Sequence, residues 1–192
     1  MSDPVVRAIS PSEIRIQGSQ AIPRMVHGDP RGFLLETHRA DDRAVRGERF
    51  AMSYVSLTVP GQYRDRDRWH VHKIQTDRFV VAVGEMILAL YDGRADSPTH
   101  DRLEAIRMSG APFDRPSLGA KEEIPTFLVP IPPGVYHCIG NLSSHPFILV
   151  NAPTELYNPA DEGRVPFSDV VPRERGVPFS WDQVEVPRPS GP

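Results

Sequence analysis

Cysteine is nearly absent from this sequence, since Cys138 is the only one among 192 residues. A lone thiol cannot form an internal disulfide, which agrees with a reducing compartment. Long apolar runs are also missing: the longest, Phe79 to Leu90, is broken by Gly84 and Glu85 and is too short to span a bilayer. The N-terminal residues MSDPVVRAIS lack the basic and apolar regions of a secretory signal. We therefore expect a soluble, cytoplasmic protein with no membrane partner.

No charge of one sign dominates the sequence. Lysine and arginine total 22 and aspartate and glutamate 25, which gives a net charge of −3. The densest basic stretch, RDRDR at 64–68, is interleaved with Asp65 and Asp67. A nucleic-acid-binding surface needs uncancelled positive charge, so we expect no nucleic-acid partner.

Proline is abundant, with 21 residues spread over the whole length. Proline interrupts helices, so this spacing excludes long ones. Between the prolines and glycines lie short runs rich in β-branched and aromatic residues, which are typical of strands joined by turns. The clearest runs are Phe50–Val59, Phe79–Tyr91, Thr126–Ile131 and Pro146–Val150. Strands without helices between them favour an antiparallel sandwich of the jelly-roll type.

The chain length fits one domain of ordinary size. Hydrophobic residues make up 39% of the sequence, which is enough for a normal globular core. We expect a single domain over residues 1–192, with its core at about 22–170. The C-terminal sequence PRPSGP has no apolar anchor, so residues 182–192 are expected to form a frayed tail.

The most specific local pattern is the segment WHVH at 69–72, which contains His70 and His72. In a strand, residues two apart point to the same face, so the two imidazoles would converge. Asp77 and Gly84 follow at the spacing of the first cupin motif, with aspartate in place of the usual glutamate.

The segment PPGVYHCIGN at 132–141 matches the second cupin motif, a PxG turn followed by His137 and Asn141. Two motifs in the right order are much stronger than either alone. We therefore predict an all-β cupin, a double-stranded β-helix or jelly roll with short peripheral helices at most. Its mouth would be built around His70, His72 and His137.

Two chemistries compete for this histidine cluster. His70, His72, His137 and Asp77 form a ligand set suited to one divalent metal such as Fe, Mn, Ni or Zn. Alternatively, a single histidine is a metal-free general base, and the other two contact substrate or support the structure.

Further segments resemble the dTDP-4-dehydrorhamnose 3,5-epimerase family, a branch of the cupins that works without a metal cofactor. The matches run in order from residue 27 to about 169. They are the segment HGDPRGF at 27–33 with Glu36 following, RWH at 68–70, DGRADSPT at 92–99, the turn ending in His137, and YNP at 157–159 continuing through Glu162 to FSD at 167–169.

This resemblance implies proton abstraction α to the 4-keto group of a nucleotide-diphosphate sugar, followed by reprotonation on the other face. His70 would be the base, and Asp169 would orient it. Arg78 lies near the place of the family's enolate-facing lysine, and a guanidinium would supply fixed charge there.

The resemblance also implies the residues that bind substrate. Arg31, Phe33 and Glu36 would contact the nucleotide, and Arg68 the diphosphate. His137 would bind or polarise the sugar. Members of this family are usually homodimers whose N-terminal segments complete the neighbour's site, so a homodimer is expected.

Several positions depart from the family pattern. Asn151 stands where the family has its acid tyrosine, and asparagine cannot donate a proton in turnover. Inversion at a single centre is therefore favoured, with water, Tyr136 or Tyr157 as proton donor. Met52 and Tyr54 replace the residues that read the base.

Two alternatives stay open from the sequence. One is a metal-dependent dioxygenase or isomerase that uses the histidine cluster. The other is a cupin that binds a sugar nucleotide without catalysis.

Overall fold

The computed structural model describes residues 4–42, 49–114 and 124–187. Within these ranges the regular structure consists of strands and of three short 3-10 helices. The strands are β1 (Val6–Ile9), β2 (Ile22–Arg24), β3 (Val26–Asp29), β4 (Gly32–Leu35), β5 (Tyr54–Thr58), β6 (Tyr63–Arg64), β7 (Arg68–His72), β8 (Asp77–Val83), β9 (Glu85–Asp92), β10 (Leu103–Ser109), β11 (Thr126–Ile131), β12 (Val135–Gly140), β13 (Phe147–Asn151), β14 (Glu162–Pro166) and β15 (Val184–Glu185). The 3-10 helices are η1 (Pro11–Glu13), η2 (Phe167–Asp169) and η3 (Trp181–Gln183).

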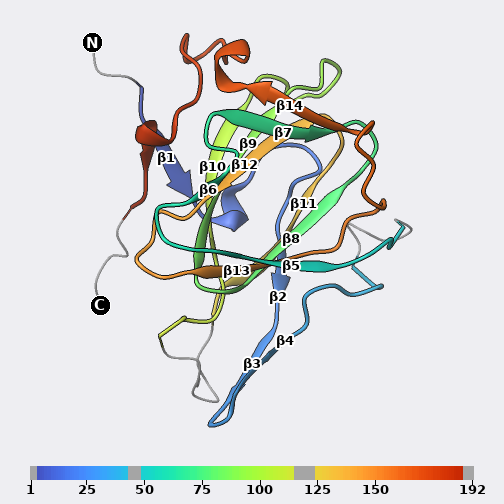
Figure 1. Ribbon diagram of the computed structural model, residues 1–192, viewed down its shortest axis with the longest axis vertical. Coiled ribbons are helices and arrows are strands. Elements are labelled where there is room, and N and C mark those ends of the chain that lie inside the picture. The colour runs from blue at the N-terminus through green and yellow to red at the C-terminus, as the bar shows by residue number, and fades with distance from the viewer. Residues whose placement is uncertain (1–3, 43–48, 115–123, 188–192) are drawn as a thin grey trace.

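Two sheets pack face to face (Figure 1). The larger has the order β14-β7-β12-β9-β10-β1-β15, with β6 paired to β12, and the smaller has the order β2-β11-β8-β13-β5. Pairing is antiparallel except where β1 lies between β10 and β15. The prediction of an all-β jelly roll with short peripheral helices at most is confirmed.

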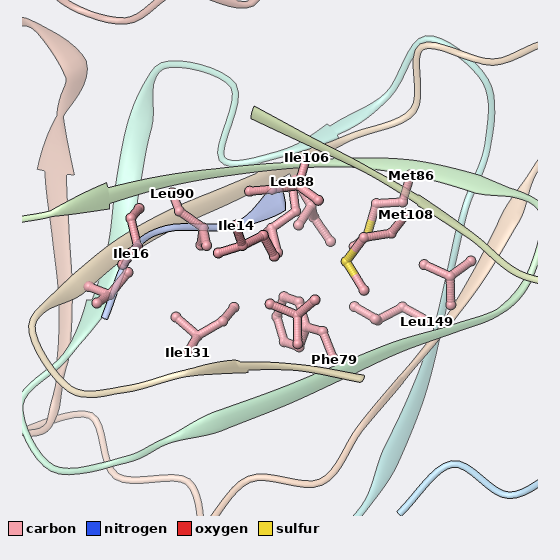
Figure 2. Close-up of a cluster of buried hydrophobic side chains, with 14 of the residues drawn as sticks. Ile14, Ile16, Phe79, Met86, Leu88, Leu90, Ile106, Met108, Ile131 and Leu149 are labelled. Carbon is pink, nitrogen blue, oxygen red and sulfur yellow. The ribbon is translucent and has the colours of Figure 1, made fainter. Parts of the chain in front are cut away.

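The main core lies between the sheets (Figure 2). Side chains alternate along a strand, so Leu88 and Leu90 of β9 face this core, while Ile87 and Tyr91 face the opposite side. On that opposite side a second apolar cluster, called the outer cluster below, forms around the fully buried Trp69. Because β9 is covered on both faces, it is apolar almost throughout, which explains the long hydrophobic run in the sequence.

Gly84 separates β8 from β9 and allows the chain to turn back toward the larger sheet. Its φ of +79° is a conformation that residues with a side chain rarely adopt. A Cβ at this position would lie 2.3 Å from the carbonyl oxygen of Pro146. The glycine of the first cupin motif is therefore required by both backbone angle and close packing.

The ends of the chain take a larger part in the fold than the expected core of 22–170 implies. Near the N-terminus, β1 joins the larger sheet, and Ile16 is fully buried in the core. At the other end, β15 pairs with β1 and Trp181 is buried in the outer cluster. The expected frayed tail at 182–192 thus has structure up to residue 187, and residues 188–192 lie outside the described ranges.

The β3–β4 hairpin forms a separate two-stranded sheet that extends away from the sandwich (Figure 1). In the described ranges, no helix has both the length and the apolar character needed to cross a membrane.

Candidate active site

A cavity of about 420 Å³ opens between the two sheets at one end of the sandwich. Both sheets line it. The smaller sheet contributes Tyr54, Ser56, Asp77, Phe79 and Leu149, and the larger contributes Tyr63, Arg64, His70, His137, Ile139 and Arg164. The cavity is therefore mixed in character, with apolar walls and several convergent ionisable groups, as expected of a ligand site.

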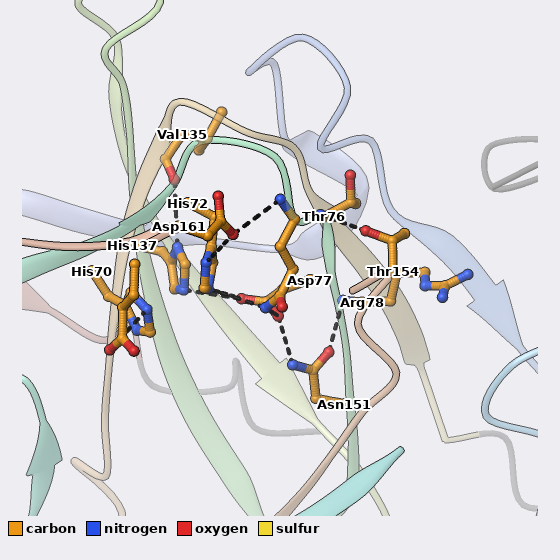
Figure 3. A network of polar contacts seen from close by, with 12 residues as sticks. His70, His72, Thr76, Asp77, Arg78, Val135, His137, Asn151, Thr154 and Asp161 are labelled. Atoms are coloured by element: carbon orange, nitrogen blue, oxygen red, sulfur yellow. Dashed lines mark hydrogen bonds and ion pairs between the residues drawn. The ribbon is translucent and has the colours of Figure 1, made fainter. Parts of the chain in front are cut away.

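The three histidines of the cupin motifs lie together (Figure 3), and His70 and His137 line the cavity. His70 and His72 share one face of β7, and His137 of β12 pairs directly across from His70. The ring centroids of His70 and His137 are 5.0 Å apart in a stacked arrangement, and those of His70 and His72 are 4.6 Å apart.

Asp77 links these histidines to the smaller sheet. Its carboxylate is almost completely buried, and His137 Nε2 lies 3.3 Å and His72 Nε2 3.5 Å from Oδ2. The amide groups of Gln75 and Asn151 donate hydrogen bonds of 2.8 and 2.7 Å to Oδ1. Burial raises the pKa of Asp77, but its contacts with His137 and His72 outweigh burial and hold the pKa below its usual range. Asp77 is therefore a paired anion.

His72 lies between two carboxylates. Its Nδ1 is 3.0 Å from Asp161, and its Nε2 faces Asp77. Burial lowers the pKa of His72, but the hydrogen bonds and charges of Asp77 and Asp161 reverse this and raise it above its ordinary value. Asp161 also accepts the backbone N–H groups of the three residues that follow His72. Asp161 was not predicted from the sequence, because it is 89 residues from His72 along the chain.

His70 has a different environment. Its side chain is only 20% exposed, and its Nε2 has no hydrogen-bond partner among the described residues. Glu162 Oε1 lies 3.4 Å from this nitrogen, and Arg164 holds Glu162 in an ion pair. Burial is the main cause that lowers the pKa of His70 to about 3, and electrostatic interactions with His137 and Arg164 add to it. His70 is therefore neutral at neutral pH, the form that can accept a proton.

The donor atoms of the alternative metal site are directed at one another. His72 turns each ring nitrogen to a carboxylate, and His137 turns Nε2 to Asp77. In the ranges that the structure describes, no group of three or more histidine, cysteine and acidic side chains has an arrangement that could hold a metal ion. A metal at His70, His72, Asp77 and His137 would first require these contacts to separate, so the residues as arranged do not fit the ion.

Arg78 faces away from the cavity. It follows Asp77 on β8, and neighbouring residues of a strand point to opposite faces. Its guanidinium donates instead to the carbonyl oxygens of Ala152 and Arg49, at 2.5 and 3.0 Å. The expected enolate-facing role of Arg78 is therefore not met by this geometry, because Asp77 takes the inward position.

Asp169 is exposed at the end of η2, where its carboxylate accepts a hydrogen bond from Ser168. The structure does not place it against His70. Among the described carboxylates, Asp77, Asp161 and Glu162 contact the histidine cluster, and Glu162 is the one beside His70.

Asn151, at the expected place of the family's acid tyrosine, is fully buried. Its Oδ1 accepts the backbone N–H of Arg78 at 2.8 Å. Its Nδ2 donates to Asp77 and, at 2.9 Å, to the hydroxyl of Tyr54. From the sequence, Tyr54 was only a replacement for a base-reading residue of the family, and the face that it shares with Ser56 on β5 was the signal for a place at the cavity.

The nucleotide-binding candidates lie apart from the cavity of their own chain. Arg31 is at the tip of the β3–β4 hairpin and pairs with Asp29, with its side chain 89% exposed. Phe33 is on β4, and Glu36 forms an ion pair with Arg39.

Arg68 shares the face of His70 on β7, but its exposed side chain pairs with Asp67. Neither of the two tyrosines considered as proton donors lines the cavity. Tyr136 packs on Tyr91 in the outer cluster, and Tyr157 is 71% exposed.

Comparison with known proteins agrees with this fold. No family model matches the sequence. The dTDP-6-deoxy-D-glucose-3,5-epimerase RmlC from Legionella pneumophila, solved in complex with dTDP-4-keto-L-rhamnose, aligns with a TM-score of 0.65 at 19% identity, covering 95% of this chain and 87% of that chain. The fold is therefore that of the RmlC-like cupins.

Two relatives are similar in sequence. The probable low-salt glycan biosynthesis epimerase Agl13 from Haloferax volcanii is 33% identical over 147 residues, which are 74% of this chain and 82% of the relative. The spore coat polysaccharide biosynthesis protein SpsL from Bacillus subtilis is 30% identical over 169 residues, 87% of this chain and 97% of the relative. The chain belongs to the RmlC-like family of dTDP-sugar epimerases.

The environment of His70 predicts a specific pH dependence of stability. An unfolded histidine takes up a proton below about pH 6.5, whereas folded His70 does so only near its lowered pKa of about 3. His70 therefore reduces the free energy of unfolding as the pH falls through this window. When the pH is lowered from 7.5 to 5, the free energy of unfolding of His70→Asn should rise by about 1–2 kcal/mol relative to that of the parent protein.

Denaturant unfolding at both pH values measures this difference. His100→Asn, at an exposed position, is the control and should show a much smaller change. A constant difference between His70→Asn and the parent protein at both pH values would contradict the environment assigned to His70.

Proposed function

We propose that this protein is a nucleotide-sugar epimerase that inverts one carbon centre α to the 4-keto group of a deoxysugar. The observation that carries the proposal is a buried, neutral imidazole, His70, in a cavity between the two sheets. Support also comes from Agl13, a probable epimerase by name, and from the ketosugar bound to the structural relative RmlC. We infer that the enzyme acts in the cytoplasm, on a sugar destined for a glycan or polysaccharide.

In this proposal His70 removes the α-proton. The C–H bond breaks, the proton passes to the imidazole, and the electron pair forms an enolate with the 4-keto oxygen. A base works best when its pKa lies near the working pH, and the pKa of about 3 makes His70 a weak base while the site holds no substrate. Activation must therefore accompany substrate binding.

Glu162 and Arg164 offer such an activation step. Arg164 lines the cavity, lowers the pKa of His70 and pairs with Glu162. A substrate diphosphate would attract this guanidinium. Glu162 would then be free to accept a hydrogen bond from the protonated His70, which stabilises the imidazolium and raises its pKa. The negative charge of the substrate would thus raise the pKa of His70 and activate it as the base.

The remaining side chains bind and position the sugar. His137 lines the cavity beside His70, and Arg64 and Arg164 supply positive charge there for the diphosphate or the enolate oxygen. Asn151 donates a hydrogen bond to Asp77 and so stabilises the adjoining wall of the cavity. In this proposal these arginines take the electrostatic role that the family resemblance implied for Arg78.

Arg31, Phe33 and Glu36 would serve the cavity of a second subunit. They lie on or next to the projecting β3–β4 hairpin, which extends away from its own sandwich (Figure 1). A homodimer in which each hairpin reaches the neighbour's cavity would give these residues their nucleotide-binding role, and Arg68 would meet the diphosphate.

Solvent exchange tests the proposed reaction. The protein is incubated in deuterated water with dTDP-4-keto-L-rhamnose, and then with the UDP- and GDP-linked 4-ketosugars, while the protons at C3 and C5 are followed by NMR. We expect deuterium at one of these carbons, with no loss after chelation. His70→Asn should lower the rate by about 10²–10⁴-fold, since it removes the base.

His100→Asn is the matched control and should exchange like the parent protein. Exchange that persists in His70→Asn would end the assignment of the base. Activity that disappears on chelation and returns with one equivalent of a divalent metal would instead establish the metal-dependent reading.

A second pair of variants identifies the carboxylate that supports His70. Glu162→Gln should slow exchange at least about tenfold, because the neutral amide cannot stabilise the imidazolium. Asp169→Asn should stay close to the parent rate, because Asp169 is exposed and bonded to Ser168. A large loss in Asp169→Asn with little effect in Glu162→Gln would show that Asp169 reaches His70 when substrate is bound.

A further inference from the structure

Tyr54 lines the cavity on the wall of the smaller sheet. It lies on β5, where Tyr54, Ser56 and Thr58 share the inward face and Val55 and Leu57 are exposed on the other. The hydroxyl is held by Asn151, which pairs directly across from Tyr54 and donates a hydrogen bond of 2.9 Å. The phenol is therefore fixed by a buried residue of the neighbouring strand.

His70 and Tyr54 line the same cavity from opposite sheets. His70 is on β7 of the larger sheet, and Tyr54 is on β5 of the smaller one. Inversion of a carbon centre requires the proton to leave from one face and return to the other. A sugar ring between the two sheets would present one face to each of these side chains.

We propose that Tyr54 donates the proton that completes inversion. This inference rests on the proposed epimerase function and assigns its second proton-transfer residue. After His70 has taken the α-proton, the phenol O–H bond breaks and a C–H bond forms on the opposite face of the enolate carbon. The 4-ketone is restored, tyrosinate remains, and a proton passes from the imidazolium through water to Tyr54 before the next turnover.

The surroundings of Tyr54 suit a proton donor. Burial and the negative charge of Asp77 raise the pKa of the phenol, while the hydrogen bond from Asn151 opposes this rise. The phenol is therefore protonated at neutral pH, and the same hydrogen bond stabilises the tyrosinate formed in the reaction. The residue is 42% exposed and lines the cavity, so solvent is available to reprotonate the phenolate oxygen.

This arrangement also accounts for Asn151. Asparagine cannot donate the proton itself, but its amide binds the phenol of the cross-strand neighbour and joins it to Asp77. In this scheme the proton donor lies on β5, one strand away from the place on β13 where the resemblance puts the family's acid tyrosine. Asn151 is a positioning residue in this scheme.

Tyr54→Phe separates the two proton transfers. Asn151 keeps its hydrogen bond to Asp77 in this variant, so the fold should be retained. With the same ketosugar in deuterated water, we expect inversion to fall at least about a hundredfold while exchange at the α-carbon stays within a few-fold of the parent protein. Exchange persists because His70 still removes the proton and returns deuterium to the same face.

Tyr157→Phe is the matched comparison, since Tyr157 is exposed and outside the cavity, and it should change neither rate. Inversion retained in Tyr54→Phe, inversion lost in Tyr157→Phe, or equal loss of exchange and inversion in a folded Tyr54→Phe would each overturn the assignment. A parent protein that exchanges no ketosugar would instead refute the epimerase function itself, and the assignment with it.

A second measurement tests the donor without deleting the ring. 3-Fluorotyrosine at position 54 has a more acidic phenol but nearly the same shape. The alkaline limb of the inversion rate should move to lower pH, while the limb for exchange stays in place. An inversion profile that does not move would contradict proton donation by Tyr54.

Discussion

The buried carboxylate of Asp77 is the constraint on which the rest of the site depends. A charge removed from water is costly unless it is paired and hydrogen-bonded, and replacing one partner leaves the other uncompensated. Asp77 meets this requirement with His72 and His137 from the larger sheet and with Gln75 and Asn151. The contacts of Asp77 with His72 and His137 connect the two sheets beside the cavity, and so they define it.

Asp77 also gives the histidines different roles. His72 lies between Asp77 and Asp161, and their hydrogen bonds and charges raise its pKa. His70 lies beyond direct contact with Asp77, and burial together with neighbouring positive charge keeps it neutral. From the sequence alone, the HxH pattern suits a pair of metal ligands equally well. In the structure, His72 is a supporting residue and His70 is free to accept a proton.

Local patterns predicted much of the fold and part of the site. Strand alternation and the two cupin motifs predicted the sandwich and the grouping of His70, His72 and His137. The same alternation favours Asp77 over Arg78 at the cavity, because adjacent residues face opposite ways. The partners Asp161 and Tyr54 depend on tertiary contacts and cross-strand register, which no motif spacing encodes.

The protonation state of His70 is the central claim, and NMR of the protein labelled with ¹⁵N-histidine measures it directly. The ring nitrogen shifts should show His70 as a neutral imidazole from about pH 7 down to about pH 5, a range in which a histidine with the ordinary pKa of about 6.5 takes up a proton. His70 should protonate only toward its pKa of about 3. A His70 that gains its proton at or above pH 6.5 would contradict the account.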